Sequence, residues 1–511
     1  MKKIKLIITF FCLILFTNVH IFAQNKTPEP QRTKIVKPFI ATNAAKGSDK
    51  DFIEINVTEP GKLAELMGER ANDIDSLVVT GTINATDFKA MWSASFNGRL
   101  SALNLEKAKV VDGIVPDYAF FNSNEQTDFS NGVIHVIALR NIMLGEGITE
   151  IGKGAFMYAT NLCEINLPST LKKLGEISFS DCKNLRTSPL VLPEGLTEIP
   201  RRCFMNCRSL SEVTLPSTIR SIGEATFFGS HITKINFPEG LEKIGDSAFY
   251  GSHLEEAVLP SSCLTLDGTA HFALNRNLRT LSLPDGLTSI PDNFAEEGLS
   301  LIDVNMPSSL KTIGNMAFSL CPLGGSLKLP EGLTEIGDRA FYGATGIREV
   351  TFPSTLLSLG MLSCDNWSGL KSIRCIGAVP PVCEIATNGL GPFGTPNYNV
   401  NDGVINSIPV YVPKGSLELY RNSPGWDIFF NFIETEYSPA AIAEVYDKDS
   451  VTVSVEGSEI AISGKEGRFT IYSLDGTTIA TGSIGNEVIR ISVSSGYYIV
   501  NACDKVKKIR I

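Results

Sequence analysis

Residues 329–344 read LPEGLTEIGDRAFYGA, and much of the chain restates this phrase. Related stretches are LCEINLPSTLKKLGEISFSDC from Leu162, LSEVTLPSTIRSIGEATFFGS from Leu210, ITKINFPEGLEKIGDSAFYGS from Ile232 and LIDVNMPSSLKTIGNMAFSLC from Leu301. The turn proline recurs every 22 to 25 residues, at Pro168, Pro193, Pro216, Pro238, Pro260, Pro284, Pro307, Pro330 and Pro353. A fixed period of this length predicts a repeat solenoid.

Each repeat can be built from its residue types. The segment L-x-x-I-x-L predicts a short strand, and Pro followed by Glu-Gly, Asp-Gly or Ser-Thr predicts a tight turn. At the bend of the second apolar edge a side chain would cost room or require an unfavourable φ, and glycine recurs there at Gly152, Gly175, Gly223, Gly245, Gly314, Gly337 and Gly360. We expect a stacked column of Phe156, Phe179, Phe204, Phe227, Phe249, Phe272, Phe294, Phe318 and Phe341.

The composition fits a folded, exported protein. The chain has 511 residues, 43% of them hydrophobic, and a net charge of -10. Residues 1–23 carry lysines, an apolar stretch and small Ala23, which predicts a signal peptide and an extracellular or outer cell-surface location. Without Lys2, Lys3 and Lys5 the charge is -13 (42 basic against 55 acidic residues), which argues against nucleic acid as a partner. No later run approaches the ~18 apolar residues of a membrane span.

The texture of the sequence predicts several further segments. Residues 24–50 read as a flexible tether, and 51–140 as an N-terminal cap with irregular first repeats, including a helix after Pro60 with Leu63, Leu66 and Met67 on one face. The leucine-rich repeats of about 23 residues occupy 141–376. A C-terminal cap follows at 377–435, where Tyr420, Trp426, Phe429 and Phe430 form an aromatic cluster, then a linker at 436–450. Residues 451–511 alternate as short strands, which predicts a small all-β sandwich.

Cysteine positions favour free thiols. Cys182, Cys207 and Cys321 each fall three residues after a repeat phenylalanine, where other repeats hold Ser230, Ser252 or Ala344. A slot shared by Cys, Ser and Ala is a small buried position, in which free cysteine behaves as a small hydrophobe. Cys182 and Cys207 lie on adjacent coils and are the pair best placed for a disulfide.

The motifs of known enzymes are absent from the sequence. There is no H-E-x-x-H, G-x-S-x-G, phosphate-binding glycine loop or C-x-x-C, so we predict a non-catalytic protein without a cofactor. His231 and His253 occupy equivalent slots, which predicts stacking on neighbouring coils, either as polar turn residues or as a two-histidine metal site without a third ligand. The turn carboxylates Glu146, Glu194, Glu239, Asp285 and Glu331 recur, on this interpretation, because the turn tolerates them.

The exposed strand slots are the candidate binding residues. One column contains Glu164, Glu212, Lys234, Glu256, Asp303 and Glu349, and the next contains Asn166, Asn236, Asn305, Lys328 and Arg374. Such columns on a solenoid make a face for an extended partner, or an ordinary solvated sheet face. They lack Trp and Tyr and have one arginine, so we expect weak or multivalent binding.

The repeats resemble the BspA-like leucine-rich repeat family of bacterial surface proteins, found widely in Bacteroidetes. The phrase from Leu329 is similar to the family consensus, and the resemblance covers 51–435, including VPKGS from Val412. Residues 451–511 resemble a type IX secretion sorting domain in FTIYSLDG from Phe469, in SGYYIV from Ser495 and in the basic residues Lys505, Lys507 and Lys508, but lack its Tyr-Pro-Asn-Pro opening. The resemblance implies cell-surface display and adhesion to host or bacterial proteins, including extracellular matrix.

Three functions follow as hypotheses. The leading one is a secreted or cell-surface adhesin that binds proteins through the solenoid strand face. The alternative is a structural spacer or assembly protein of the cell envelope. The third, a glycan-active enzyme, is disfavoured because histidines and exposed aromatic residues are few on the strand faces.

Overall fold

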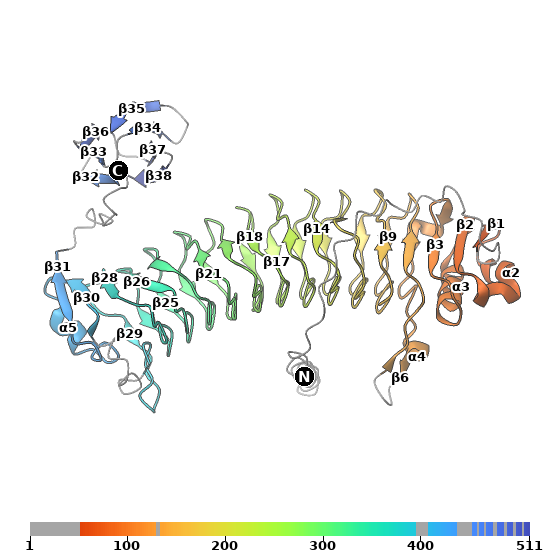
Figure 1. Cartoon of the computed structure of the whole chain (residues 1–511), viewed down its shortest axis with the longest axis horizontal. Coiled ribbons are helices and arrows are strands. Elements are labelled where there is room, and N and C mark those ends of the chain that lie inside the picture. Colours follow the sequence, from red (N-terminus) through yellow and green to blue (C-terminus); the bar gives the residue numbers. More distant parts are fainter. Residues whose placement is uncertain are drawn as a thin grey trace. The chain divides into compact units, whose positions relative to one another are not determined.

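The chain forms a parallel β-solenoid in which each regular coil adds one strand to each of two rows (Figure 1). The computed structural model describes residues 52–128, 133–394 and 407–436 and, between 452 and 510, seven strands with Val488 and Val493. The predicted leader and tether, and residues 437–450 of the predicted linker, lie outside the described residues. The fold class predicted from the repeat is therefore confirmed for the solenoid.

The first row, here the first face, holds the strands that precede the turn proline. It consists of four parallel sheets rather than one. Their strands are β1 (Phe52–Val57), β2 (Ser76–Ile83), β3 (Ala102–Asn104), β8 (Asn141–Met143) and β10 (Glu164–Ile165), with β4 (Ala108–Val110) beside β2; β12 (Leu190–Val191), β14 (Glu212–Thr214) and β16 (Lys234–Ile235); β18 (Glu256–Val258), β20 (Thr280–Ser282) and β22 (Asp303–Val304); and β24 (Gly325–Lys328), β26 (Ile347–Phe352), β28 (Ser372–Cys375), β30 (Val410–Pro413) and β31 (Phe432–Thr435).

The second row, here the second face, holds the strands that follow the turn. It comprises three parallel sheets of two-residue strands. These are β5 (Ile114–Val115), β9 (Glu150–Ile151) and β11 (Lys173–Leu174); β13 (Glu198–Ile199), β15 (Ser221–Ile222), β17 (Lys243–Ile244) and β19 (Thr265–Leu266); and β21 (Ser289–Ile290), β23 (Thr312–Ile313), β25 (Glu335–Ile336), β27 (Ser358–Leu359) and β29 (Val382–Cys383).

A third side of each coil carries the repeat phenylalanine and a further backbone ladder. The Phe179 N–H donates to the Cys203 carbonyl at 2.9 Å, and the Phe204 N–H donates to the Thr226 carbonyl at 2.9 Å. The residues two before and two after the phenylalanine take left-handed backbone conformations, as at Ile177 (φ 52°) and Asp181 (φ 60°). This side therefore turns the chain while keeping its amides paired to the next coil.

The predicted phenylalanine column forms the core of the solenoid. From Phe120 to Phe272 the rings stack with centroids 5.2–5.6 Å apart and planes within 18°. Phe294 breaks the column, since its ring meets those of Phe272 and Phe318 at 77° and 81°. In this coil Ala295 occupies the phenylalanine slot, because its N–H donates to the Ala317 carbonyl as the repeat phenylalanines do in other coils. The prediction that Phe294 belongs to the stack is wrong.

The bend positions require glycine because there is no room for a side chain, and not because the backbone adopts a positive φ. A Cβ on Gly175 would lie 2.4 Å from the carbonyl carbon of Gly152 in the preceding coil. None of the predicted bend glycines has a positive φ. Stacked coils approach backbone to backbone here, so a side chain at this slot would push two coils apart.

The turns alternate strictly between two kinds. A Glu-Gly or Asp-Gly coil is always followed by a Ser-Thr or Ser-Ser coil, from Glu146 to Thr355. The Glu194 carboxylate accepts bonds from the backbone N–H (3.1 Å) and hydroxyl (3.0 Å) of Ser217 in the next coil. The Thr218 hydroxyl accepts from the Gly195 N–H at 2.9 Å and donates to the Leu196 carbonyl at 2.7 Å. The carboxylates of four turns therefore bond to a serine of the next coil, a role beyond mere tolerance by the turn; these are Glu146, Glu194, Glu239 and Glu331.

The N-terminal cap closes the solenoid with helices α2 (Leu63–Met67), η1 (Gly68–Asp73) and α3 (Ala85–Phe96). Asn84 and Asp87 form a capping box at the start of α3. The Asp87 carboxylate also accepts the N–H groups of Gly61 (2.7 Å) and Leu63 (2.9 Å), which ties α2 to α3. Leu63 and Met67 are buried, whereas Leu66, predicted on the same face of this helix, is 51% exposed.

An insertion follows β5 and contains α4 (Ser123–Gln126) and the hairpin of β6 (Thr127–Asp128) and β7 (Val133–Ile134); η2 (Val111–Gly113) precedes β5. Buried Gln126 anchors the insertion, since its Oε1 accepts from the Trp92 indole N–H at 2.9 Å and from the Asn122 N–H at 2.7 Å. Its amide group also donates to the His135 carbonyl.

The C-terminal cap contains α5 (Leu417–Arg421) and an aromatic cluster over the last coils. Tyr420, Trp426 and Phe429 are buried as predicted, and Phe393 packs against Trp426 with ring centroids 5.3 Å apart. Phe430 is 75% exposed and is not part of this cluster, which corrects the prediction.

Beyond the linker lie seven antiparallel strands in two sheets. They are β32 (Thr452–Glu456), β33 (Glu459–Ser463) and β36 (Ile489–Ser492) in one sheet, and β34 (Gly467–Ser473), β35 (Thr478–Ile484), β37 (Tyr497–Ala502) and β38 (Lys505–Arg510) in the other. Their common core contains Ile460 and Ile462 from the first sheet and Phe469, Ile471 and Val500 from the second.

The nine described cysteines are free thiols, and eight are buried. The Cys182 thiol donates to the Phe156 carbonyl at 3.1 Å, and the Cys207 thiol donates to the Phe179 carbonyl at 3.2 Å. The disulfide considered between them is not formed. Burial raises the pKa of both thiols well above its usual value, so they are poor nucleophiles.

Candidate functional site

The first face is interrupted at three places, and each interruption follows an asparagine. The strands β10, β16 and β22 each end a sheet, and Asn166, Asn236 and Asn305 come directly after them. In these three coils the strand has two residues, whereas β14 and β20, with threonine or serine in the same slot, have three. Asparagine in this slot does not always end the sheet, since Asn104 in the same slot belongs to β3, which pairs with β8.

The asparagine amide replaces a backbone group of the ladder. The Asn305 Oδ1 accepts from the Leu283 N–H and its amide donates to the Leu283 carbonyl at 2.9 Å; Asn236 bonds Leu215 and Asn166 bonds Leu144 in the same way. In an uninterrupted coil the corresponding acceptor is a backbone carbonyl, as when the Leu192 N–H donates to Thr214. Three of the predicted binding residues therefore have amides committed to the preceding coil.

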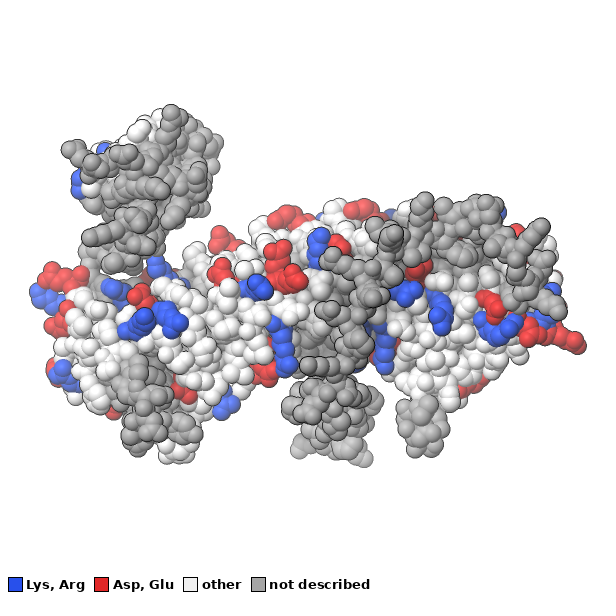
Figure 2. Space-filling view, in the orientation of Figure 1, with Lys and Arg blue, Asp and Glu red and all other residues white. Residues whose placement is uncertain are grey.

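The predicted charged residues lie on all four sheets of the first face. Glu164 lies on the first sheet, Glu212 and Lys234 on the second, Glu256 and Asp303 on the third, and Lys328, Glu349 and Arg374 on the fourth. Glu212 and Lys234 form an exposed ion pair at 3.1 Å, and the Arg374 guanidinium lies 5.1 Å from the centre of the Tyr411 ring. Figure 2 shows the described basic side chains interspersed with acidic ones along the solenoid.

The interruption between β22 and β24 opens into a pocket of about 370 Å³. Its walls are Ile302, Val304, Met306, Leu323 and Leu327, and the predicted binding residues Asp303 and Lys328 also line it. Gly324 lines the pocket without a side chain; it is exposed, and the buried residue of this coil is its neighbour Leu323. The Gly324 N–H donates to the Ile302 carbonyl at 3.0 Å, so Gly324 lies beside Ile302, the residue after Leu301. A Cβ on Gly324 would meet only the Ile302 carbonyl oxygen, at 3.8 Å. The glycine pair Gly324-Gly325 is the sequence signal for this pocket.

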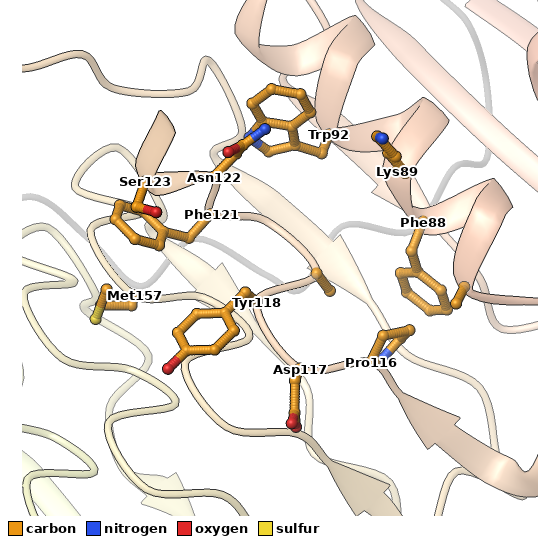
Figure 3. Close-up of a pocket in the computed structure, with 12 residues that line it drawn as sticks. Phe88, Lys89, Trp92, Pro116, Asp117, Tyr118, Phe121, Asn122, Ser123 and Met157 are labelled. Carbon is orange, nitrogen blue, oxygen red and sulfur yellow. The ribbon is translucent and has the colours of Figure 1, made fainter. Parts of the chain in front are cut away.

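A second pocket, of about 600 Å³, lies in the N-terminal cap between α3 and the insertion (Figure 3). Phe88, Lys89 and Trp92 come from α3, and Asp117, Tyr118, Phe121, Asn122 and Ser123 come from the chain after β5. Sequence reasoning missed this site, because residues from segments about 30 positions apart meet there outside the repeat. The only available signal was the length of chain between Val115 and Asn141 that does not follow the period.

Tyr118 is the exposed ring of this cap pocket. It is 40% exposed, whereas Phe88, Trp92 and Phe121 are buried. A Cβ on Gly154 would lie 2.5 Å from the Tyr118 Cε1 atom, so the ring lies directly on the backbone of the next coil. Trp92 is held in turn by Phe96, whose ring stacks on it at 5.2 Å.

His231 and His253 lie in equivalent slots of adjacent coils. The rings of His231 and His253 stack at 4.1 Å with planes 11° apart, as predicted from their slots. Burial lowers the pKa of His231 to about 4, with further lowering by His253 and Arg208. Within the described parts of the chain, no group of three or more His, Cys, Asp and Glu side chains is placed to hold a metal ion.

His271 is completely buried, and neither ring nitrogen has a hydrogen-bond partner. It occupies the small slot before the repeat phenylalanine and packs against Phe294, the next residue in that slot, with ring centroids 5.7 Å apart. Burial lowers its pKa to about 4, against an opposing effect of Asp246 and Asp267. Its position in the core makes it a structural residue rather than a ligand.

The fold defines a leucine-rich-repeat solenoid. Residues 125–379, covered by overlapping matches at 125–253, 197–324 and 321–379, match the model of the BspA type leucine-rich repeat region. The chain thus carries a BspA-type repeat region over the coils described above. No helix among the described residues is both long and apolar enough to cross a membrane.

Solved structures of other repeat proteins are similar to this chain. A leucine-rich cell surface protein from Faecalibacterium prausnitzii is 22% identical, with 55% of this chain and 84% of that chain covered and a TM-score of 0.33. A leucine-rich repeat protein from Bacteroides ovatus is 21% identical, over 55% and 80%, with a TM-score of 0.36. The pneumococcal vaccine antigen PcpA is 18% identical, over 71% and 80%, with a TM-score of 0.38. No curated protein matches significantly. Likenesses of this strength do not indicate what the chain binds.

Proposed function

We propose that this chain is an exported, non-catalytic scaffold of the bacterial surface that binds another protein through the first face. The pocket between β22 and β24 is the observation that carries the proposal. It is a hollow lined by both apolar and polar groups on the strand face, flanked by Asp303 and Lys328. A partner side chain inserted there would be desolvated, while the polar rim would orient the partner.

The partner proposed is an extended segment of a host matrix protein or of another bacterial surface protein. Parallel strands on the first face keep side chains of adjacent coils in register, as Glu256, Thr280 and Asp303 are. Successive coils therefore offer repeated, similar contacts to an extended chain. The charged columns are exposed, so each ion pair contributes little and the binding is multivalent. Export through the predicted signal peptide, and the resemblance of residues 451–511 to a sorting domain, support display at the surface.

Solid-phase binding of the full chain to fibronectin and fibrinogen, at two salt concentrations, tests this function. The variant Gly324→Leu places a side chain in the pocket, and should abolish saturable binding while the solenoid stays folded. A second variant replaces Glu212, Lys234, Glu256, Asp303 and Glu349 by alanine and should weaken binding and its salt dependence.

The matched control replaces Lys173, Lys243 and Glu335 on the second face by alanine, and should bind as the unmodified chain does. Binding that survives Gly324→Leu would remove the pocket from the proposal. If the unmodified chain binds no matrix or bacterial surface protein, a spacer or assembly role in the cell envelope is favoured. Turnover in a glycan hydrolase screen would instead support the enzyme hypothesis.

A further inference from the structure

The cap pocket offers a second, chemically different binding site, independent of the first face. Its volume of about 600 Å³ lies within the roughly 300–1,000 Å³ typical of small-ligand sites. Tyr118 presents its exposed ring to this space, and Figure 3 shows the ring between Met157 and Phe88. The ring is not a mobile surface side chain, because it rests on the backbone at Gly154. The pocket therefore contains a rigid aromatic surface.

The polar groups around this ring include both donors and acceptors. Among the described residues, the Lys89 ammonium, the Tyr118 hydroxyl and the Ser123 hydroxyl have no hydrogen-bond partner. Asp117 uses one carboxylate oxygen to accept the Lys153 N–H at 2.7 Å, and its second oxygen makes no hydrogen bond among those residues. Lys89 and Asp117 cancel each other's formal charge, and the chain carries a net charge of -10. A neutral ligand rich in hydroxyl groups satisfies these groups better than an anion does.

We propose that the cap pocket binds a neutral hexopyranose, either free or at the end of a glycan. A pyranose ring has one face of C–H groups, which packs on the electron-rich face of an aromatic ring, and an edge of hydroxyl groups. The C–H face of the sugar would lie on the Tyr118 ring, and its hydroxyl edge would reach Lys89, Asp117 and Ser123. A peptide anchor is the weaker alternative, because Phe88, Trp92 and Phe121 are already buried and leave one exposed aromatic ring. This site binds sugar without cleaving it and is separate from the proposed protein-binding face.

Saturation-transfer NMR on the full chain, with methyl glycosides of glucose, galactose, mannose and N-acetylglucosamine as probes, tests the proposal. At least one glycoside should receive saturation, most strongly at the C–H protons of one ring face, and should change the fluorescence of the three tryptophans through Trp92. Tyr118→Ala should weaken the affinity about tenfold, the upper end for loss of one aromatic contact.

Two further variants separate a binding role from a folding role. Lys89→Gln changes an exposed residue of α3 and should weaken binding while the circular dichroism spectrum stays unchanged. Gly154→Ala leaves every polar group of the pocket in place but displaces the Tyr118 ring, and should reproduce the loss seen in Tyr118→Ala. Tyr342→Ala, which removes a half-buried tyrosine from a distant coil, is the matched control and should bind normally.

The proposal is overturned if none of the four glycosides binds the full chain, or if binding is unchanged in both Tyr118→Ala and Lys89→Gln. It is also overturned if N-acetyl-tryptophanamide binds with loss in Tyr118→Ala while no glycoside does, because the pocket would then recognise peptide. A glycan array probed with the same proteins then identifies which terminal sugar is preferred. Loss of protein binding in Gly324→Leu without loss of sugar binding would show that the two sites are independent.

Discussion

The regular repeats and the places where the repeat fails differ in what they build. From Phe120 to Phe272 the coils keep the repeat, and their phenylalanine rings stack within 18° of parallel. Hollows occur instead beside the exposed glycine pair Gly324-Gly325 and at the insertion after β5. A strict period specifies a close-packed core, since each coil repeats the shape that the previous coil requires. The departures from it are therefore where binding sites are expected.

The largest effect is expected from breaking the regular core at its centre. Phe204→Ala removes a fully buried ring that contacts Phe179 and Phe227 at 5.3 and 5.6 Å. It should destabilise the solenoid by about 3–5 kcal/mol. Because coils contact mainly their neighbours, the loss should be local at first, and hydrogen exchange should accelerate in the coils around residues 179–227 before elsewhere. Uniform acceleration across the whole chain would contradict this view of nearest-neighbour stability.

The next effect concerns His271, a core residue that differs from the alanine found in the same slot of other coils. Its pKa of about 4 in the folded chain lies below the usual 6.5, so the unfolded chain binds the proton more readily. Stability is complete above pH 6.5 and is lost as the pH falls from 6.5 to about 4. The loss amounts to about 3 kcal/mol, from the difference between these two values.

His271→Ala provides the control for that pH dependence, since alanine occupies the same slot at Ala248 and Ala317. The variant should be less stable at pH 7 because of the cavity, but should lose about 2.4 kcal/mol less between pH 7 and pH 4.5. Urea denaturation at both pH values measures this difference. His231 and His253, whose pKa values burial also lowers, remain in both proteins and cancel. Equal losses in the two proteins would mean that His271 is not held neutral.

The sequence predicted the regular part of this molecule well and the departures poorly. The period, the phenylalanine column, the stacking of His231 on His253 and the small cysteine slots all follow from comparing one repeat with the next. The prediction for Phe294 was wrong because this coil reads Phe-Ala where other coils read Ala-Phe. Phenylalanine therefore lies one position earlier, and Ala295 takes the slot that faces the stack. The cap pocket was not predictable, since the contact between α3 and the insertion has no counterpart elsewhere in the chain.

For the predicted binding residues, the sequence could not show which side chains bond to the backbone of the preceding coil. An exposed asparagine slot looks the same in sequence whether its amide faces solvent or bonds Leu283, as Asn305 does. Likewise, the alternation of Glu-Gly and Ser-Thr turns is visible in the sequence, but its physical reason is a contact between adjacent coils. Ser217 of one coil donates hydrogen bonds to the Glu194 carboxylate of the coil before it. The repeat pattern in the sequence identifies equivalent positions, and the hydrogen bonds between coils determine the role of the side chain at each position.

A smaller effect on stability should come from filling the pocket beside Gly324. Gly324→Leu places a side chain in the pocket between β22 and β24, and nothing lies closer than 3.8 Å to its Cβ. Because position 324 is exposed, the leucine is only partly buried, and this contact together with a less flexible backbone should raise stability by about 1 kcal/mol. Thermal unfolding of the variant against the unmodified chain measures this. A decrease in stability would mean that the pocket cannot accept a side chain, and that its loss of partner binding has a trivial cause.

The smallest expected effect concerns a strained position on the regular third side. Leu320 is 38% exposed with φ 60°, in a slot that holds Asn206, Gly229 and Asn366 in other coils, all with positive φ. Leucine is disfavoured there by about 1–2 kcal/mol, whereas asparagine tolerates the left-handed conformation. Leu320→Asn should therefore stabilise the chain by about 0.5–1 kcal/mol, because the relief of strain is partly offset by the smaller apolar area that asparagine buries. The control is Leu357→Asn, an exposed leucine without positive φ, which should be neutral or destabilising in the same urea titration. If Leu320→Asn instead destabilises the chain, the Leu320 side chain contributes packing that outweighs the strain, and this slot belongs with the core.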